Sequence, residues 1–290
     1  LTPEEQLVPE NDEKEIPYAT ALNSLLPTDI RITSVCLRPP QGFDARFSCL
    51  YRHYKYIFDK LGLDLELMQQ AAQKYVGRHD FRNFCKIDGS KNITNYERDI
   101  LGAKIIPLEG YEDYYVFDLK GTAFLWHQVR CMMAILLLIG QKLEKLSVID
   151  ELFDVDSNNG RPLYDIANDI PLILYDCVYP EMEWVAGTET SRPPKILKDN
   201  QLVRGMLSDY QLKSIVTEMV AKKALHDETG IHTAGGLGVI NIGDGKGRNF
   251  KKYTKVMDRD VLDSFEVSNA KHKEKKRRRR EAEKEMLELK

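Results

Sequence analysis

The alternation of apolar and polar residues predicts a sheet built from strands throughout the first half of the chain. Between Phe43 and Phe58 the pattern has the period of a strand, and it places Tyr54, Tyr56 and Phe58 on one face. Further strands are predicted from Ile30 and over residues 92–106, 114–120 and 171–177. Turn residues separate these segments, so we expect a mostly antiparallel sheet.

Helical periodicity is clearest between Ala123 and Lys142. This segment is apolar nearly all round, so its helix should be buried against the sheet. Shorter helices are predicted over residues 64–75, 147–152 and 201–224. The longest strongly apolar run, Cys131 to Ile139, is too short to span a bilayer, and we expect no membrane contact. Together the elements predict an α+β fold with a central sheet flanked by helices.

Changes in composition divide the chain into three predicted regions. Residues 1–19 are acidic and are expected to be a loop or the remnant of an N-terminal subdomain. Residues 20–188 carry the α+β pattern and are predicted to form the catalytic part. Residues 189–290 are predicted to be a helical or disordered extension with a Gly-rich loop over 226–249 and a basic tail.

Charge is unevenly distributed in this chain of 290 residues and net charge −3. Between Arg46 and Lys104 there are eleven basic and seven acidic residues, with aromatic residues interleaved. Such a mixture suits a nucleic-acid surface, although a solvated face above core aromatics would look the same. The tail over 271–290 holds ten basic and five acidic residues. It could be a solvated helix, a nucleic-acid arm or a nuclear import signal.

Several kinds of site are disfavoured by the spacing of chemistry-bearing residues. The five cysteines form no Cys-x-x-Cys pair, which favours a reducing compartment and argues against a disulfide scaffold. His79 and Cys85 have no second pair of ligands near them, so no metal is expected. The Gly243–Gly247 segment lacks the Ser or Thr and the first Gly of a phosphate-binding loop, and it is predicted to be a flexible surface loop. No cofactor is expected.

Four segments together resemble the TruA family of tRNA pseudouridine synthases, in the family's order and at about its spacing. They are NSLLPTDI at 23–30, FDARFSCLYRHYKY at 43–56, GRHDFRNF at 77–84 and GTAFLWHQVR at 121–130. The detail is closest to the eukaryotic branch that modifies positions 38 and 39 of the tRNA anticodon stem-loop. The resemblance implies the pseudouridine synthase fold and an isomerase that detaches uracil from N1 and reattaches it through C5.

The resemblance also implies roles for particular side chains. Tyr54 takes the place of a tyrosine that contacts the base, and Arg130 that of an arginine that pairs with a catalytic aspartate. A phenol of ordinary pKa is a poor base, so stacking could be the main contribution of Tyr54. The other candidates for RNA contact are Arg46, Arg52, Lys55, Arg78, His79, Arg82 and His127. For Arg46, His79 and His127 a structural role remains open.

One element of the family pattern is missing. The nucleophilic aspartate belongs to an Arg-Thr-Asp-x-Gly-Val-type loop, and this sequence contains no such motif. We therefore expect the chain to be inactive without a segment that carries the aspartate. A non-catalytic RNA-binding or scaffolding module is the alternative, and a nuclear adaptor that uses only the basic tail is a third hypothesis. The resemblance further implies tRNA as partner, a homodimer, and a location in nucleus and cytoplasm.

Overall fold

The computed structural model describes residues 1–2, 4–186, 193–224 and 238–288. These residues form two compact units, which are treated separately below. The first comprises 1–48 and 179–228, and the second comprises 49–178 and 229–290. The predicted 20–188 domain is thus shared between the two units, and its functional boundaries stay a prediction. No described helix is both long and apolar enough to cross a membrane.

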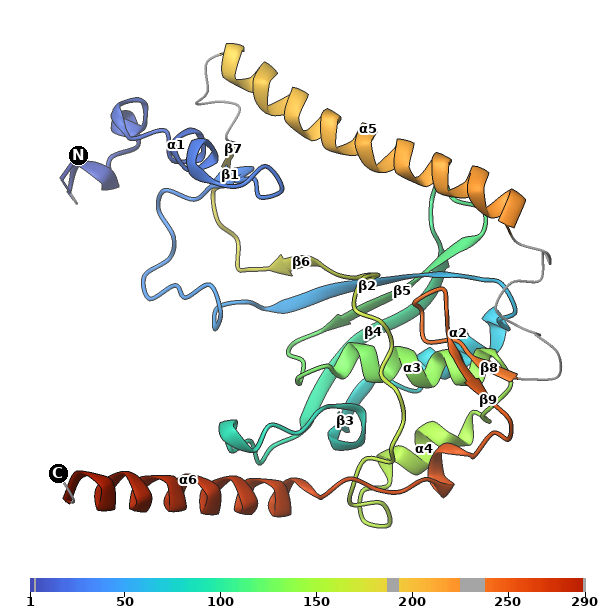
Figure 1. The fold of residues 1–290 in the computed structure, drawn as a ribbon. Coiled ribbons are helices and arrows are strands. Elements are labelled where there is room, and N and C mark those ends of the chain that lie inside the picture. The colour runs from blue at the N-terminus through green and yellow to red at the C-terminus, as the bar shows by residue number, and fades with distance from the viewer. Residues whose placement is uncertain (3, 187–192, 225–237, 289–290) are drawn as a thin grey trace. The chain divides into compact units, whose positions relative to one another are not determined.

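The second unit is built on a five-stranded sheet in which all neighbours are antiparallel (Figure 1). Its strand order is β3-β4-β5-β2-β6. The strands are β2 (Tyr51–Asp59), β3 (Gly77–Asp80), β4 (Glu97–Pro107), β5 (Tyr114–Gly121) and β6 (Leu172–Val178). Tyr56 and Phe58 are buried and Tyr54 is half-buried, which confirms the predicted common face. The α+β class with an antiparallel central sheet is confirmed.

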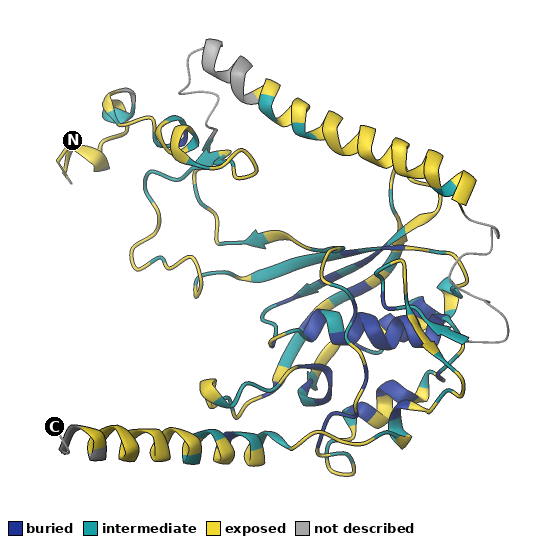
Figure 2. Cartoon of the chain, viewed as in Figure 1, coloured by how far each residue is buried: buried dark blue, intermediate teal, exposed yellow. Residues whose placement is uncertain are grey.

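Helices α2 (Leu65–Gln73), α3 (Gln128–Gly140) and α4 (Ser147–Phe153) complete the core of this unit. Of the α3 residues only Arg130 is not fully buried, because the helix is enclosed on all sides (Figure 2). The helix begins at Gln128 rather than at the predicted residue 123, because His127 adopts a left-handed conformation with φ 59°. Asp64 caps α2 by accepting a hydrogen bond from the Leu67 N–H.

Strand β2 starts at Tyr51, so the predicted strand from Phe43 is too long at its beginning. Asp44 accepts hydrogen bonds from the backbone N–H groups of Arg46 and Phe47, and this turn replaces extended chain. Two short 3₁₀ helices, η3 (Arg82–Phe84) and η4 (Gly89–Lys91), lie between β3 and β4. They bring Phe81 and Phe84 into the core.

The C-terminal part of the second unit folds back onto α3 and the segment that follows it. Strands β8 (Gly238–Ile240) and β9 (Arg248–Phe250) form an antiparallel hairpin. Gln141 donates to the Val239 carbonyl and accepts from the Asn241 N–H. The buried carboxylate of Glu144 accepts from the Tyr253 hydroxyl at 2.7 Å and the Val256 N–H at 2.8 Å. The loop prediction is therefore wrong for residues 238–240 and 248–249, which are strands, whereas residues 241–247 do form a loop between them. Residues 226–237 of that loop lie outside the described residues.

Two further elements end the second unit, the 3₁₀ helix η6 (Val256–Asp258) and the long helix α6 (Phe265–Glu288). Helix α6 contains the predicted basic tail, so the described part of the tail is helical.

The first unit contains the N-terminal segment and one long helix. Its elements are η1 (Glu5–Leu7), η2 (Pro9–Lys14), α1 (Tyr18–Leu25), β1 (Ser34–Val35), β7 (Val185–Ala186) and α5 (Pro193–Ala224). Arg38 binds both carboxylate oxygens of Asp12, at 2.6 and 2.8 Å. The predicted strand from Ile30 is wrong: pairing with β7 starts only at Ser34, and the exposed Ile30 closes a turn onto the Pro27 carbonyl.

The close packing of α2 on α3 gives a first testable prediction. A methyl group at Gly140 would lie 2.7 Å from Met68 Sδ, so Gly140→Ala should lower the free energy of unfolding by about 1–3 kcal/mol. Gly102→Ala is the matched control, because a methyl group there meets nothing within 4 Å. Urea denaturation of both variants measures the difference. Equal stabilities would show that the α2–α3 packing is not as tight as described.

Candidate active site

Tyr54 lies in the central part of β2, on the sheet face that packs against α3. It pairs with Leu119 of β5 and Leu174 of β6. Its ring meets Phe124 edge to face, with centroids 5.0 Å apart. Burial raises the pKa of the Tyr54 phenol, with smaller contributions from charged neighbours. The ring is thus a partly enclosed, uncharged surface of the kind that a pyrimidine can stack on.

Arg130 points from the first turn of α3 into a half-buried position, with 16% of its side chain exposed. Its Nε donates to the Ala167 carbonyl at 2.6 Å, and the Ala167 N–H donates back to the Arg130 carbonyl. Its Nη1 lies 3.6 Å from Asp169 Oδ2, but the Asp169 side chain is 72% exposed. Such an exposed ion pair contributes little. Nη2 makes no hydrogen bond to any described residue, so one side of the guanidinium is open to a further acceptor.

His127 stands beside Arg130 at the start of α3. Its Nδ1 lies 3.4 Å from Arg130 Nη1, and its ring packs on Trp126. Burial and then the Arg130 charge lower the pKa of His127, which favours the neutral imidazole. A neutral ring can accept a hydrogen bond at Nδ1, so His127 helps to orient the guanidinium.

Tyr56 was not among the predicted site residues, yet the charge of Arg130 acts on its phenol. Its side chain is fully buried, and its hydroxyl has no hydrogen-bond partner among the described residues. Burial raises the pKa of the phenol, the Arg130 charge lowers it, and Asp244 and Asp169 raise it. Tyr56 therefore links β2 to the Arg130 region. Its position two residues after Tyr54 on the same strand face was a usable signal in the sequence.

The Gly-rich loop that the sequence disfavoured as a phosphate site forms one wall of this region. Gly243 packs against the Tyr56 hydroxyl, and the Ile242 carbonyl accepts from the Asn168 N–H at 2.7 Å. Asp244 accepts from the N–H groups of Lys246 and Gly247. Because the carboxylate of Asp244 occupies these donors, they are not available to a phosphate.

The structure brings Tyr54 and Arg130 to the same side of the sheet without direct contact. There is no hydrogen bond or cation–π contact between these two described side chains, and the Arg130 charge acts on the phenol of Tyr56, two residues after Tyr54 on β2. Arg130 faces the protein rather than bulk solvent, as its predicted role requires. Its role and that of Tyr54 stay predictions.

Three further candidates lie at the start of β2 and before it. Arg52 donates from Nη1 to the Thr122 carbonyl at 3.0 Å. The Lys55 ammonium lies 3.5 Å above the Tyr175 ring. Arg46 belongs to the first unit and lies over the Phe47 ring at 5.5 Å.

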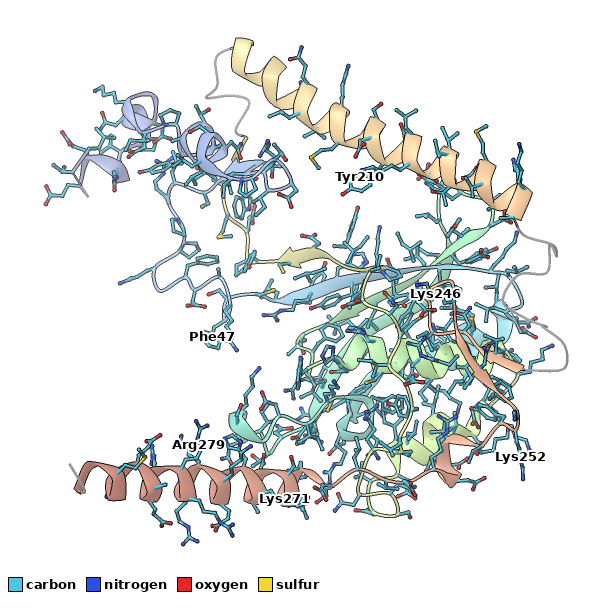
Figure 3. The ribbon with its side chains drawn as sticks, viewed as in Figure 1. Phe47, Tyr210, Lys246, Lys252, Lys271 and Arg279 are labelled. Carbon is cyan, nitrogen blue, oxygen red and sulfur yellow. The ribbon has the colours of Figure 1, made fainter. Side chains whose placement is uncertain are left out.

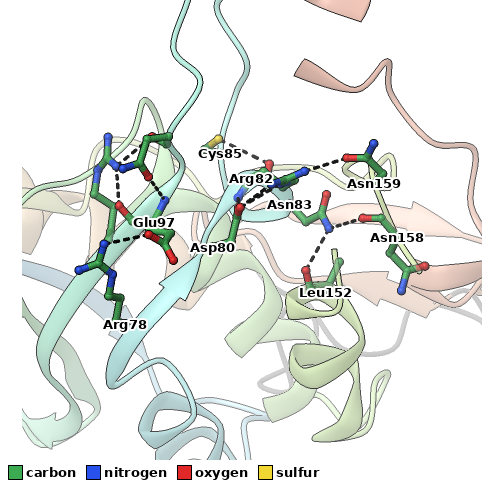
Figure 4. Close-up of polar contacts among 11 residues, drawn as sticks. Arg78, Asp80, Arg82, Asn83, Cys85, Glu97, Leu152, Asn158 and Asn159 are labelled. Carbon is green, nitrogen blue, oxygen red and sulfur yellow. Dashed lines mark hydrogen bonds and ion pairs between the residues drawn. The ribbon is translucent and has the colours of Figure 1, made fainter. Parts of the chain in front are cut away.

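The remaining candidates lie in β3 or just after it, and Figure 4 shows the polar contacts of two of them, Arg78 and Arg82. Arg78 is exposed and pairs with Glu97 at 2.8 Å. Arg82 binds the Asp80 carboxylate at 2.6 Å and also reaches Asn159. His79 stacks on the Phe153 ring at 4.3 Å. Arg78 is the most accessible of the three to RNA, whereas Arg82 and His79 already have structural contacts.

Among the described residues, no group of three or more His, Cys, Asp or Glu side chains is arranged to hold a metal ion.

The contact between Gly243 and Tyr56 gives a second prediction. Gly243 has φ 76°, and a methyl group there would collide with the Tyr56 hydroxyl. Gly243→Ala should therefore lower the free energy of unfolding by about 2–4 kcal/mol. Tyr56→Phe removes a hydroxyl that has no partner and should be neutral or slightly stabilising. In the double variant, Tyr56→Phe should recover about 1 kcal/mol or more, measured by urea denaturation. Strict additivity would mean that the loop does not pack on this phenol.

A family model and several known proteins match much of this chain. The family model for tRNA pseudouridine synthases matches residues 71–180. The chain is 50% identical over 276 residues to the tRNA pseudouridine(38/39) synthase of Saccharomyces cerevisiae, covering 95% of this chain and 61% of the relative. It is 47% identical over 185 residues to the human tRNA pseudouridine(38/39) synthase, covering 61% of this chain and 38% of the relative.

An archaeal relative is matched over most of its own length. The tRNA pseudouridine synthase A of Methanothrix thermoacetophila is 30% identical over 215 residues, which cover 73% of this chain and 74% of that protein. The chain thus spans less than two thirds of the yeast and human relatives but most of the archaeal one. With the antiparallel sheet, the Tyr54 strand and the buried arginine helix in the matched order, the chain belongs to the tRNA pseudouridine synthase family.

Proposed function

We propose that this chain supplies the base-binding and arginine side of a site that isomerises uridine to pseudouridine in the tRNA anticodon stem-loop. The observation that carries this proposal is the state of Arg130. Its guanidinium is half-buried and is oriented by Ala167 and His127, and among the described residues only the exposed Asp169 forms an ion pair with it. A buried arginine is most stable with a close carboxylate, so the geometry suits an aspartate that arrives from another segment.

The reaction breaks the bond between uracil N1 and ribose C1′, and forms a bond between C5 and the same C1′. The proton at C5 leaves and N1 gains a proton, so the product has the mass of the substrate. In this scheme Arg130 holds the attacking carboxylate ionised and aimed. Tyr54 contacts the extruded base, and the buried surroundings of both groups exclude water from the detached sugar.

The finer proposal is that the uridines are those at positions 38 and 39. It is supported by the names of the yeast and human relatives, and by their identities of 50% and 47%. The archaeal relative is named only as a tRNA pseudouridine synthase A.

The test follows the hydrogen at C5. An anticodon stem-loop RNA with tritium at C5 of uridines 38 and 39 is incubated with the chain and with a loop-extended chain, which carries the family's Arg-Thr-Asp loop at its amino terminus. We expect both to bind the RNA, and only the loop-extended chain to release tritium and to form pseudouridine. RNA with tritium at other uridines is the control for position.

The alternative, a binding module without chemistry, makes a different prediction for the same experiment. Such a module would bind RNA in both forms and would release no tritium even with the loop present. Failure of both forms to bind tRNA would contradict both hypotheses.

We further propose that the protein works as a homodimer located in nucleus and cytoplasm. The family resemblance supports the dimer, and the exposed basic run Lys276–Arg280 on α6 supports nuclear import. Sedimentation equilibrium would test the subunit count. Imaging of a tagged chain with and without the basic run would test the location.

A further inference from the structure

Helix α6 is fixed to the second unit at its beginning. Phe265 packs on Tyr96 with ring centroids 5.0 Å apart, and the Arg82 guanidinium lies 5.0 Å from the Phe265 ring. The buried Asn269 donates to the Ile93 carbonyl at 3.2 Å. A methyl group at Gly89 would lie 2.8 Å from the Ser268 carbonyl oxygen, so η4 approaches the helix closely. The direction of α6 relative to the catalytic sheet is thereby set by its first two turns.

Beyond Glu274 every side chain of α6 that the structure describes is exposed (Figure 2), and most residues from there to Lys284 are basic. Residues 271–284 hold nine basic and three acidic side chains, although the whole chain has a net charge of −3. Figure 3 shows two of these basic side chains, Lys271 and Arg279, on α6.

One face of the helix carries a continuous row of cations, which we call the α6 stripe. Its members follow one another at helical spacings of i, i+3, i+4, i+7 and i+11: Lys273, Lys276, Arg277, Arg280 and Lys284. The row is about 16 Å long at 1.5 Å per residue. Arg277 pairs with Glu274 and Glu281, whereas the other four members form no ion pair with a described residue.

The stripe costs helix stability, which argues for a bound partner. Lys276 and Arg280 are like charges four residues apart, as are Arg280 and Lys284, and such pairs destabilise an isolated helix. Between Lys271 and Lys284 the only apolar residue is Ala282. A helix that lies on a membrane or in a coiled coil needs an apolar face, and this segment has none. A regular row of cations without apolar residues matches the phosphates of a nucleic acid.

We propose that the α6 stripe is an RNA-binding arm that contacts tRNA phosphates away from the uridine site. This inference rests on the proposed function, since it takes tRNA as the ligand. The arm adds sequence-independent affinity and helps to set the register of the RNA on the catalytic sheet. The catalytic groups Tyr54 and Arg130 do not belong to it.

Two fourfold variants of the chain test the arm. The stripe variant combines K273Q, K276Q, R280Q and K284Q. The control variant combines K271Q, K275Q, R278Q and R279Q, which lie on the opposite face. In the control set Lys271 pairs with Asp263 and Arg278 with Glu274. Each variant removes four positive charges, so the effect of net charge is the same in both.

Binding of fluorescent tRNA is measured by anisotropy at several salt concentrations. We expect the stripe variant to bind at least tenfold more weakly at near-physiological salt, and the slope of log K against log salt to fall by about 3. The control variant should change affinity less than threefold. Equal losses of tRNA affinity in the two variants, or no loss in the stripe variant, would contradict the proposal that the α6 stripe is an RNA-binding arm.

A failure of the arm can be told from a failure of the proposed function. In one outcome the unaltered chain binds tRNA and its loop-extended form converts uridine, but the two variants bind tRNA equally well. Only the proposal of an RNA-binding arm would then be wrong. If the unaltered chain does not bind tRNA, the proposed function is wrong too. The stripe variant could instead keep full tRNA affinity and lose binding to an import receptor. That result would show that the stripe binds a protein partner and would contradict the RNA-binding proposal.

Discussion

Replacing Arg130 with alanine in the loop-extended chain is expected to lower uridine conversion by about 10³-fold while tRNA affinity changes less than threefold. The reason is that the guanidinium holds the attacking carboxylate, and a methyl group leaves that charge unpaired in a half-buried site. Arg130→Lys should recover only part of the loss, since an ammonium cannot reproduce the fork that binds Ala167 and a carboxylate together. Single-turnover tritium release measures both variants.

Arg161→Gln is the matched control for loss of a buried arginine. Arg161 is 6% exposed, donates to the Tyr164 carbonyl and packs on the Tyr164 ring. Its replacement should lower the free energy of unfolding without a comparable loss of turnover by the folded protein. If Arg161→Gln and Arg130→Ala lost conversion equally, the effect of replacing Arg130 would be structural. The proposal that Arg130 holds the attacking carboxylate would then be contradicted.

Tyr54→Phe is expected to lower conversion by about 10²-fold at unchanged tRNA affinity. Phenylalanine keeps the stacking surface but removes the hydroxyl, and a polar group of the base left without that hydrogen bond costs about 1–3 kcal/mol, or up to roughly 10²-fold in rate. Tyr54→Ala should lose more, because the contact with the base and the contact with Phe124 disappear as well. Product formation under single-turnover conditions separates this step from binding.

The pKa of Tyr54 adds a pH signature to this prediction. Burial raises that pKa above the ordinary value of about 10, so the phenol stays protonated at neutral pH. The rate should therefore show no inflection from this group below pH about 9. Tyr51→Phe, on the same strand, is the control and should retain normal conversion. Normal conversion by Tyr54→Phe would show that Tyr54 contributes to the reaction only by stacking on the base.

The wrong predictions have a common cause. Residues 238–249 look like a loop because glycines and polar residues dominate them. Gln141 and Glu144 lie more than ninety residues earlier in the chain. They form hydrogen bonds with the Val239 carbonyl and the Tyr253 hydroxyl, and these bonds hold the segment in place. The helix predicted from residue 123 starts later because His127 takes a left-handed turn. Contacts between distant residues, or one unusual backbone angle, decided both cases.

The candidate site divides in a similar way. The motifs that contain Tyr54 and Arg130 could be recognised in the sequence. The structure places both residues on the same side of the sheet. Tyr56 and the Gly243 loop were missed as neighbours of Arg130. A buried hydroxyl without a partner and a glycine pressed against it are visible only when two segments far apart in the chain are packed together.

By itself the sequence determined the α+β class, the alternating face of β2, the buried helix α3 and the family, because each depends on local periodicity or on short motifs. Only the tertiary structure decided which side of Arg130 is open, which loop covers Tyr56 and where the α6 stripe is anchored. The first depends on Ala167, 37 residues from Arg130, and the other two on segments more than a hundred residues apart, and no local pattern encodes how such segments meet.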